Sequence, residues 1–318
     1  MANGVIATQV RVAPLPLPAP GFEKFTFPRY RGLLLGTETP ETTQERFALG
    51  AWLGETPVGL AFYSRSFGEE KNRRLLSVMV SPLMRRQGIA TRLFAQGENL
   101  ARELGAKKIT TIHSSQMQAF AAFEALLRKA GWDAPKELEY RLAGKASWAV
   151  QAQGDWAPFL ARLGKRGFSV SAWTEMTEAD REEIRKVVES STDEAGRAFD
   201  PFKQNEDFQA LVVPELSVLL RRDGQIAGWI IGARGLAANT YHYSSGYAVP
   251  SVRRAGWLIG GVWEVCRRQA ELFGGESISV FETSPQNQGM RRLMDRQLKL
   301  YSVWTDARYI SEKRLDGQ

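Results

Sequence analysis

A glycine and two adjacent arginines form the segment of this sequence that is best suited to bind an anion. Residues 78–91 read VMVSPLMRRQGIAT and join a predicted strand to a predicted helix. Gly88 permits a close approach to the backbone, and the first turn of a helix presents N–H groups at the positive end of its dipole. Arg85 and Arg86 add positive charge. The segment predicts a cradle for a group such as a pyrophosphate; a basic turn that binds nothing is the alternative.

The positive charge of the chain is concentrated in the same region. The whole sequence has a net charge of +7, and residues 71–108 alone hold nine lysines and arginines against Glu98 and Glu103, an excess of the same size. A local basic field suits an anionic ligand such as a phosphorylated cofactor. Nucleic acid would also suit it, but no recognised nucleic-acid motif accompanies the charge. We therefore expect no nucleic-acid partner.

The spacing around Gly88 occurs a second time. Both copies read Pro-x-x-Arg-Arg-x-Gly, at residues 82–88 and 250–256, and the second lies 168 positions after the first. The segments Pro57-Val58-Gly59 and Ile226-Ala227-Gly228 lead into apolar strands, and predicted strands start at residues 109 and 278; each of these pairs is 169 positions apart. Three landmarks at a nearly constant offset predict two homologous units. A chain of 318 residues is also long enough for two domains.

Each unit places the motif between a strand and a helix. In the first unit, residue types and spacing predict strands at 25–35, 47–53, 58–64, 75–80 and 108–113 and helices at 88–104 and 116–130. In the second unit they predict strands at 216–221, 226–232, 241–249 and 277–282 and helices at 177–188, 257–273 and 288–299, the first of them opened by a capping box from Thr177 to Asp180. This order describes an α/β (α+β) fold with a mixed sheet. We expect domains at 22–147 and 167–318, an N-terminal arm at 1–21 and a connector at 148–166.

The motif resembles the acetyl-CoA motif of the GNAT (GCN5-related N-acetyltransferase) superfamily. The family core is Arg/Gln-x-x-Gly-x-Gly/Ala after a Val-x-Pro strand end. Arg85, Gly88 and Ala90 match the core, and Val80 and Pro82 match the approach. The predicted order of strands and helices in the first unit also fits. By this resemblance the chain is identified as a tandem member with two GNAT-like acyl-CoA N-acyltransferase domains.

The resemblance implies an acyl-CoA site in the N-terminal domain. The CoA pyrophosphate would be held by the charges and amides of Arg85, Arg86, Gln87, Gly88, Ile89, Ala90 and Thr91, and pantetheine would pair with the backbone of Val78 and Val80. The C-terminal copy keeps Arg253 and Gly256, but Trp257 and Leu258 replace the Ile-Ala pair. We expect this copy to bind CoA weakly or not at all and to have an acceptor-binding or structural role. Its acidic insert at 177–214 would attract a cationic acceptor.

Catalysis in this family is usually direct attack of a neutral amine on the thioester, with a base for the ammonium proton and an acid for the thiolate. The usual acid, a tyrosine, is replaced here by Leu127. His113 ends the strand that would border the thioester and is our first candidate for the base; a structural buried histidine is the alternative. Ser115 could donate to the thiolate or cap a helix. Glu282, at the end of the last predicted strand, is the carboxylate candidate.

The expected activity is transfer of an acyl group, acetyl or longer, from acyl-CoA to a primary amine of a small molecule or peptide, as in specialised metabolism. The alternative is a degenerate pair that senses acyl-CoA or serves as a protein-interaction scaffold without turnover. We expect no metal, because the two histidines are far apart in sequence, and no membrane insertion, because no apolar stretch is long enough. A single cysteine, Cys266, and the lack of a secretory signal predict a cytoplasmic protein. We expect a monomer or homodimer.

Overall fold

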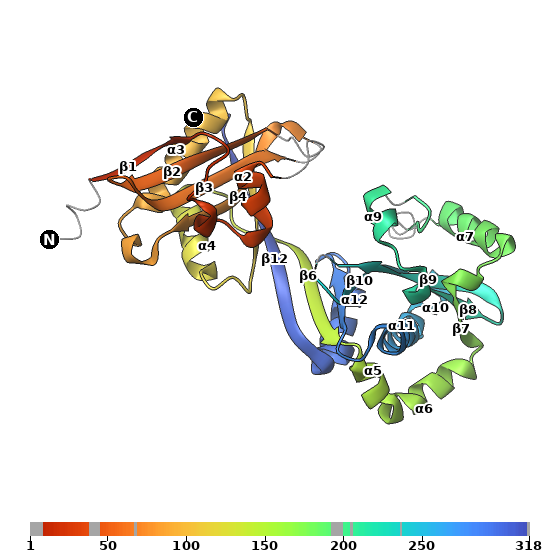
Figure 1. Cartoon of the computed structure of the whole chain (residues 1–318). Coiled ribbons are helices and arrows are strands. Elements are labelled where there is room, and N and C mark those ends of the chain that lie inside the picture. The colour runs from red at the N-terminus through yellow and green to blue at the C-terminus, as the bar shows by residue number, and fades with distance from the viewer. Residues whose placement is uncertain are drawn as a thin grey trace. The chain divides into compact units, whose positions relative to one another are not determined.

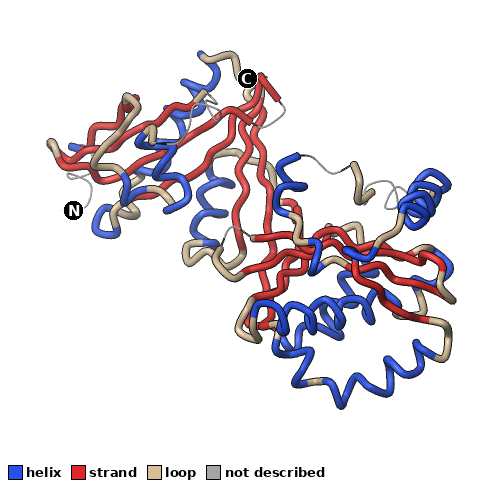
Figure 2. Tube along the Cα trace, turned by 45° about the vertical axis from the view of Figure 1, so that its right-hand side comes forward, coloured by secondary structure: helices blue, strands red, loops and turns tan. Residues whose placement is uncertain are grey.

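The computed structural model describes residues 9–37, 45–66, 69–191, 200–203, 206–235 and 237–316. It divides the chain into two compact units (Figure 1). Unit 1 comprises Met1–Leu138 and Ala307–Gln318, and unit 2 comprises Glu139–Asp306. Each unit contains a β-sheet with both parallel and antiparallel neighbours and with helices packed against it (Figure 2). The predicted α/β class with a mixed sheet is confirmed.

The sheet of unit 1 positions the motif at the end of its fourth strand. Its strand order is β1-β2-β3-β4-β5-β12, and only β4 and β5 pair in parallel. The strands are β1 (Val10–Leu15), β2 (Arg46–Leu53), β3 (Thr56–Ser66), β4 (Glu69–Val80), β5 (Lys108–Ser114) and β12 (Ser302–Arg314). A parallel neighbour pair needs a crossover connection, and the crossover from β4 to β5 carries the motif and the helix that follows it.

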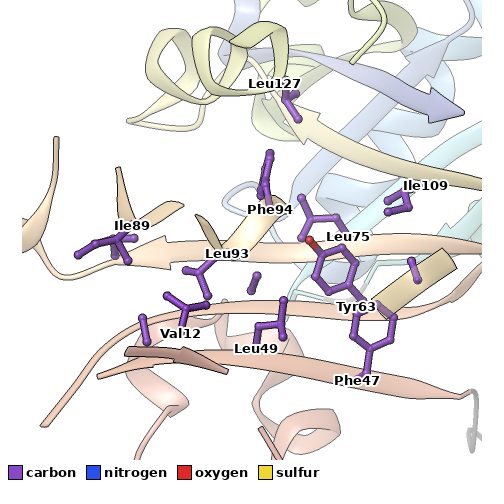
Figure 3. Packing of buried hydrophobic residues seen from close by; sticks show 14 of the residues in the cluster. Val12, Phe47, Leu49, Tyr63, Leu75, Ile89, Leu93, Phe94, Ile109 and Leu127 are labelled. Atoms are coloured by element: carbon purple, nitrogen blue, oxygen red, sulfur yellow. The ribbon is translucent and has the colours of Figure 1, made fainter. Parts of the chain in front are cut away.

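Two apolar clusters hold the helices of unit 1 on opposite faces of the sheet. The main cluster joins the strands to α3 (Ile89–Glu103) and α4 (Phe120–Lys129), and Figure 3 shows Ile89, Leu93 and Phe94 among strand residues. Their spacing puts these residues on one helix face. A smaller cluster joins the other face to η1 (Glu23–Phe25), η2 (Pro28–Tyr30) and α2 (Arg31–Leu35). The short helix η4 (Pro82–Met84) precedes α3.

Unit 2 repeats this plan. Its strand order is β6-β11-β10-β9-β8-β7, and only β10 and β11 pair in parallel. The strands are β6 (Lys136–Lys145), β7 (Phe168–Ala172), β8 (Val218–Arg222), β9 (Gln225–Arg234), β10 (Thr240–Ala248) and β11 (Ile278–Thr283). The helices are α5 (Ser147–Gln151), α6 (Gln153–Gly164), η5 (Trp173–Glu175), α7 (Glu178–Ser190), α9 (Glu206–Leu211), η6 (Pro214–Leu216), α10 (Pro250–Arg253), α11 (Trp257–Phe273), α12 (Gln288–Leu293), the π-helical turn η7 (Met294–Leu298) and η8 (Lys299–Tyr301).

The predicted first strand at 25–35 is wrong, and the true first strand lies in the segment predicted as an arm. Residues 25–35 include three aromatic and three leucine residues, but Pro28 opens one short helix and Gly36, with φ of 67°, ends the next. In β1, Val10 and Val12 are buried while Arg11 is exposed, the alternation of a strand with one buried face. Residues 1–8 of the predicted arm lie outside the described residues.

The domain bounds also differ from the prediction at the connector and at the C-terminus. Residues 148–166 form most of α5 and α6 rather than an irregular connector. Strand β12 begins in unit 2, but its residues from Ala307 onward belong to unit 1 and pair with β5. The order of elements along the chain does not reveal that the last strand pairs with β5, because a strand can pair with any free sheet edge that it reaches. In the acidic insert, residues 192–199 and 204–205, including Asp193 and Glu194, lie outside the described residues.

Candidate functional site

The ladder between the two parallel strands of unit 1 ends halfway along them. Pairing runs from Asn72 with Lys108 to Leu75 with Thr111 and goes no further. At the last pair, the Thr111 hydroxyl donates a hydrogen bond of 3.2 Å to the carbonyl of Leu75. The rest of β4 pairs with β3 but not with β5. Its other backbone edge can therefore receive an extended ligand in the manner of an added strand.

Val78 and Val80 lie on this part of β4. They pair with Ala61 and Gly59 of β3, respectively, on the opposite edge. The carbonyl of Val80 also accepts a hydrogen bond of 3.2 Å from Nε of Arg85. Arg85 therefore fixes the end of the strand to the turn that follows, which is a structural contact in addition to the charge predicted for it.

The turn before α3 has an unusual backbone. Arg86 has a φ of 64° and Gly88 a φ of 75°. A non-glycine residue in this left-handed region costs roughly 1–2 kcal/mol, and such strain is commonly retained where the turn has a function. An added Cβ at Gly88 would meet no other atom within 4 Å. A group can therefore approach the backbone here without displacing a side chain.

The start of α3 carries unused hydrogen-bonding capacity. No side chain caps the helix, although the first turn of a helix has N–H groups without partners inside the helix. The side-chain oxygen of Gln87 is buried and has no hydrogen-bond partner in the structure. Arg85 and Arg86 are exposed, whereas Ile89 is buried in the main cluster. The predicted cradle residues from Arg85 to Thr91 thus lie together, and Ala90 and Thr91 form the first turn of the helix with Ile89.

Unit 2 has the same turn with its open space filled. Arg253 Nε donates to the carbonyl of Ala248 at 2.9 Å, as Arg85 does to Val80, and Gly256, with a φ of 82°, precedes α11. An added Cβ at Gly256, however, would lie 3.1 Å from the ring of Phe159 in α6. Trp257 is fully buried, and Arg254 has an ordinary φ of −75°.

His113 lies on β5 just beyond the last pair with β4. Its ring is surrounded by Phe120, Phe123 and Tyr309, with ring centroids 5.2–5.9 Å away. Its side chain is buried, and neither ring nitrogen makes a hydrogen bond, although Nε2 is 3.7 Å from a carboxylate oxygen of Glu124. Burial lowers the pKa of His113, and Glu124 partly opposes this effect. The ring is therefore neutral near pH 7 and able to accept a proton.

Ser115 and Glu282 occupy different places from His113. The hydroxyl of Ser115 accepts a hydrogen bond of 2.9 Å from the backbone N–H of Ala307, which extends the pairing of β5 with β12. Glu282 lies in β11 of unit 2, where its carboxylate is 3.9 Å from Nδ1 of His242. Unit 1 therefore brings His113 and Ser115 to one strand end, and Glu282 belongs to the other unit.

Two findings about metal ligands and membrane spans apply to the described residues. Within them, no group of three or more His, Cys, Asp or Glu side chains is arranged to hold a metal ion. None of the helices in the described ranges has the length and apolar character that spanning a membrane requires.

Comparison with known proteins agrees with the geometry of unit 1. Residues 19–127 match the family model of the acetyltransferase (GNAT) family. Residues 19–127 of this chain therefore form a GNAT domain. Members of the superfamily transfer acyl groups from acyl-CoA and use acetyl-CoA as co-substrate, which indicates the general class of reaction. The matched residues lie in unit 1 and include the whole turn from Val80 to Thr91.

Solved structures share the fold of the whole chain, both units included. A tandem GNAT protein from the clavulanic acid biosynthesis pathway has a TM-score of 0.57 at 12% identity, over 97% of this chain and 100% of that one. A GCN5-related N-acetyltransferase from Sphaerobacter thermophilus has a TM-score of 0.55 at 16% identity, over 96% of each chain. These identities show the fold alone, and the fold is that of tandem GNAT proteins. No significant match was found among curated proteins.

Phe159 is the residue that sequence reasoning missed. It belongs to α6, in the segment predicted as a connector, and no spacing relates it to Gly256. The bulk of Trp257 was the available signal that the second turn differs from the first.

Proposed function

We propose that the protein transfers an acyl group from acyl-CoA to a primary amine, with the acyl-CoA bound to unit 1. The observation that supports this most directly is the contrast between the two turns: the space beside Gly88 is open, and the space beside Gly256 is filled by Phe159. The backbone amides from Gln87 to Thr91 and the charges of Arg85 and Arg86 would hold the pyrophosphate. The free edge of β4 at Val78 and Val80 would pair with pantetheine.

The reaction in this proposal needs no covalent enzyme intermediate. The amine nitrogen attacks the thioester carbonyl carbon, the carbon–sulfur bond breaks, and the thiolate leaves and takes up a proton. His113, as a neutral imidazole at the strand end, is our candidate to remove the ammonium proton, with the neighbouring Glu124 as the group that would stabilise the imidazolium. Ser115 is our candidate for the acid; its hydroxyl oxygen accepts a backbone hydrogen bond from Ala307, which holds it at the strand end. In this proposal Glu282 and unit 2 support the acceptor or the fold.

Calorimetric titration with acetyl-CoA and longer acyl-CoAs tests the proposal. The parent protein should bind with micromolar affinity, and Gly88→Trp should abolish binding because the indole would fill the cradle. Gly105→Trp is the matched control: Gly105 also has a φ of 75° and open space beside it, but follows the other end of α3. Both variants pay the same backbone cost, so only Gly88→Trp should lose binding.

Two results of this titration would contradict the proposal. One is equal affinity in the two variants, and the other is no binding by the parent protein. Release of CoA when amines are added separates turnover from sensing. Tight acyl-CoA binding without CoA release for any amine would favour the sensor or scaffold interpretation.

A further inference from the structure

Arg74 lies on the face of the unit 1 sheet that is opposite α3. Phe62 of β3 belongs to the small cluster under η1 and α2. Ser64 lies two residues further along β3 and so points to the same face, and Arg74 pairs with Ser64. On its other side Arg74 pairs with Thr110, one position before the ladder between β4 and β5 ends. Arg74 therefore lies next to the point where the acyl group is proposed to lie.

Arg308 lies on the same face, on the far side of β5. Ile109 of β5 packs in the main cluster with α3, so the alternate residues Thr110 and Ser114 point to the opposite face. Arg308 of β12 pairs with Ser114. The two arginines therefore flank the end of β5 on the face away from α3.

Arg29 and Tyr30 approach this face from η2. Tyr30 packs against the same small cluster as Phe62, and the guanidinium of Arg29 lies 4.7 Å from the centre of the Tyr30 ring. Burial lowers the pKa of Arg74; Tyr30 opposes this, and the positive charges of Arg308 and Arg29 add to it. Three guanidinium groups from three different elements thus act on one location.

Arg74 has an unused hydrogen-bond donor at this location. Nε of Arg74 is buried and has no hydrogen-bond partner in the structure. A buried donor without an acceptor and several like charges close together are both unfavourable. Carboxylates and phosphates match the guanidinium fork and form its strongest hydrogen bonds. Arginines arranged in this way beside a proposed reaction point indicate a binding site for part of a substrate.

We propose that the acceptor carries a compact anionic group, a carboxylate or a phosphate, near its amine, and that Arg74, with Arg29 and Arg308, binds this group. The inference rests on the proposed function of unit 1. It assigns the acceptor to the amino acids or the phosphorylated amines, whereas the acidic insert suggested a cationic acceptor.

Matched pairs of amines test this inference on the full-length protein. CoA release from acetyl-CoA is followed with a thiol reagent for alanine against alaninamide, and for phosphoethanolamine against ethanolamine. In at least one pair the anionic member, alanine or phosphoethanolamine, should have a kcat/KM at least tenfold higher than its uncharged partner. The pair in which this holds shows whether the site binds a carboxylate or a phosphate. Arg74→Gln should raise KM for the preferred amine at least tenfold and leave the affinity for acetyl-CoA unchanged.

Further variants keep the inference testable if Arg74→Gln folds poorly. Arg29 is exposed, and Arg29→Gln should raise the KM for the preferred amine. Arg128 is exposed on α4, and Arg128→Gln should leave this KM unchanged. The inference would be overturned if the parent protein has equal kcat/KM for the charged and uncharged amines of both pairs. It would also be overturned if Arg29→Gln and Arg74→Gln lower kcat/KM equally for charged and uncharged amines. The inference would also be overturned if the protein binds acetyl-CoA but neither acylates any anionic amine nor binds one in calorimetry. Absence of acetyl-CoA binding would instead overturn the proposed function.

Discussion

Replacing Lys313 by methionine would leave a buried carboxylate of unit 1 without its cation. Lys313 lies in β12, the last strand of the chain, and its ammonium group is 2.6 Å from a carboxylate oxygen of Glu98 in α3. It also donates to the carbonyl of Ala130 after α4. Only 8% of the Glu98 side chain is exposed, and Trp132 donates to its other oxygen at 3.1 Å. One lysine of β12 thus holds both helices of the main cluster.

The size of the effect follows from the burial of the pair. Removing one partner of a buried ion pair costs about 3–5 kcal/mol, because the remaining charge is left without a partner. This decrease in the free energy of unfolding corresponds to roughly 10²- to 10⁴-fold faster exchange of the most protected amide hydrogens. Hydrogen exchange followed by mass spectrometry on peptides from α3 measures it directly, and it reports unit 1 separately from unit 2.

Two further variants control for the loss of a lysine and for the unpaired charge. Lys129→Met removes an exposed lysine of α4 and should change the free energy of unfolding by less than about 0.5 kcal/mol. Adding Glu98→Gln to Lys313→Met should recover part of the loss, since an amide carries no charge. If Lys313→Met exchanges no faster than Lys129→Met, then β12 does not stabilise unit 1 as we argue.

Three other predictions concern single groups. His113→Phe should lower kcat at least 100-fold without changing acetyl-CoA affinity. Burial lowers the pKa of His113, so the parent protein should lose stability below about pH 6.5, where the unfolded state takes up the proton. His113→Phe should remove this loss of stability. Unchanged kcat would reassign His113 to packing. Arg221 and the cap at Thr177 hold the pKa of Asp180 at about 2, so its stabilisation is present above about pH 4 and is lost as the pH falls toward 2; Asp180→Asn should cost unit 2 about 1 kcal/mol in chemical denaturation at pH 7 and abolish this dependence. Burial raises the pKa of Cys266 to about 12, so a thiol reagent should react with it only after unfolding; rapid reaction in the folded protein would contradict its burial.

The turn before α3 could be predicted from the sequence because its residues are adjacent along the chain. Gly88, the arginines before it and the strand and helix on either side are local features, and the structure brings them together at one turn. The helix at 257–273 and the capping box at Thr177 are equally local, and both are confirmed. The repeat was visible because spacing survives when side chains change.

Features that depend on distant parts of the chain could not be predicted. Phe159 fills the space beside Gly256 from another helix, and Arg308 reaches the face of Arg74 only because β12 pairs with β5. No periodicity records either contact. The prediction at 25–35 was wrong for a different reason: Pro28 within the run and Gly36 just after it outweigh the strand preference of its aromatic residues.

Hydrogen exchange of the full-length protein with and without saturating acetyl-CoA tests the central claim most directly. Peptides that cover Gln87–Thr91 should exchange more slowly when acetyl-CoA is present, because their amides would donate to the pyrophosphate, and peptides that cover 255–259 should not change. Protection of residues 255–259 with none at Gln87–Thr91 would contradict the account and place the donor in unit 2.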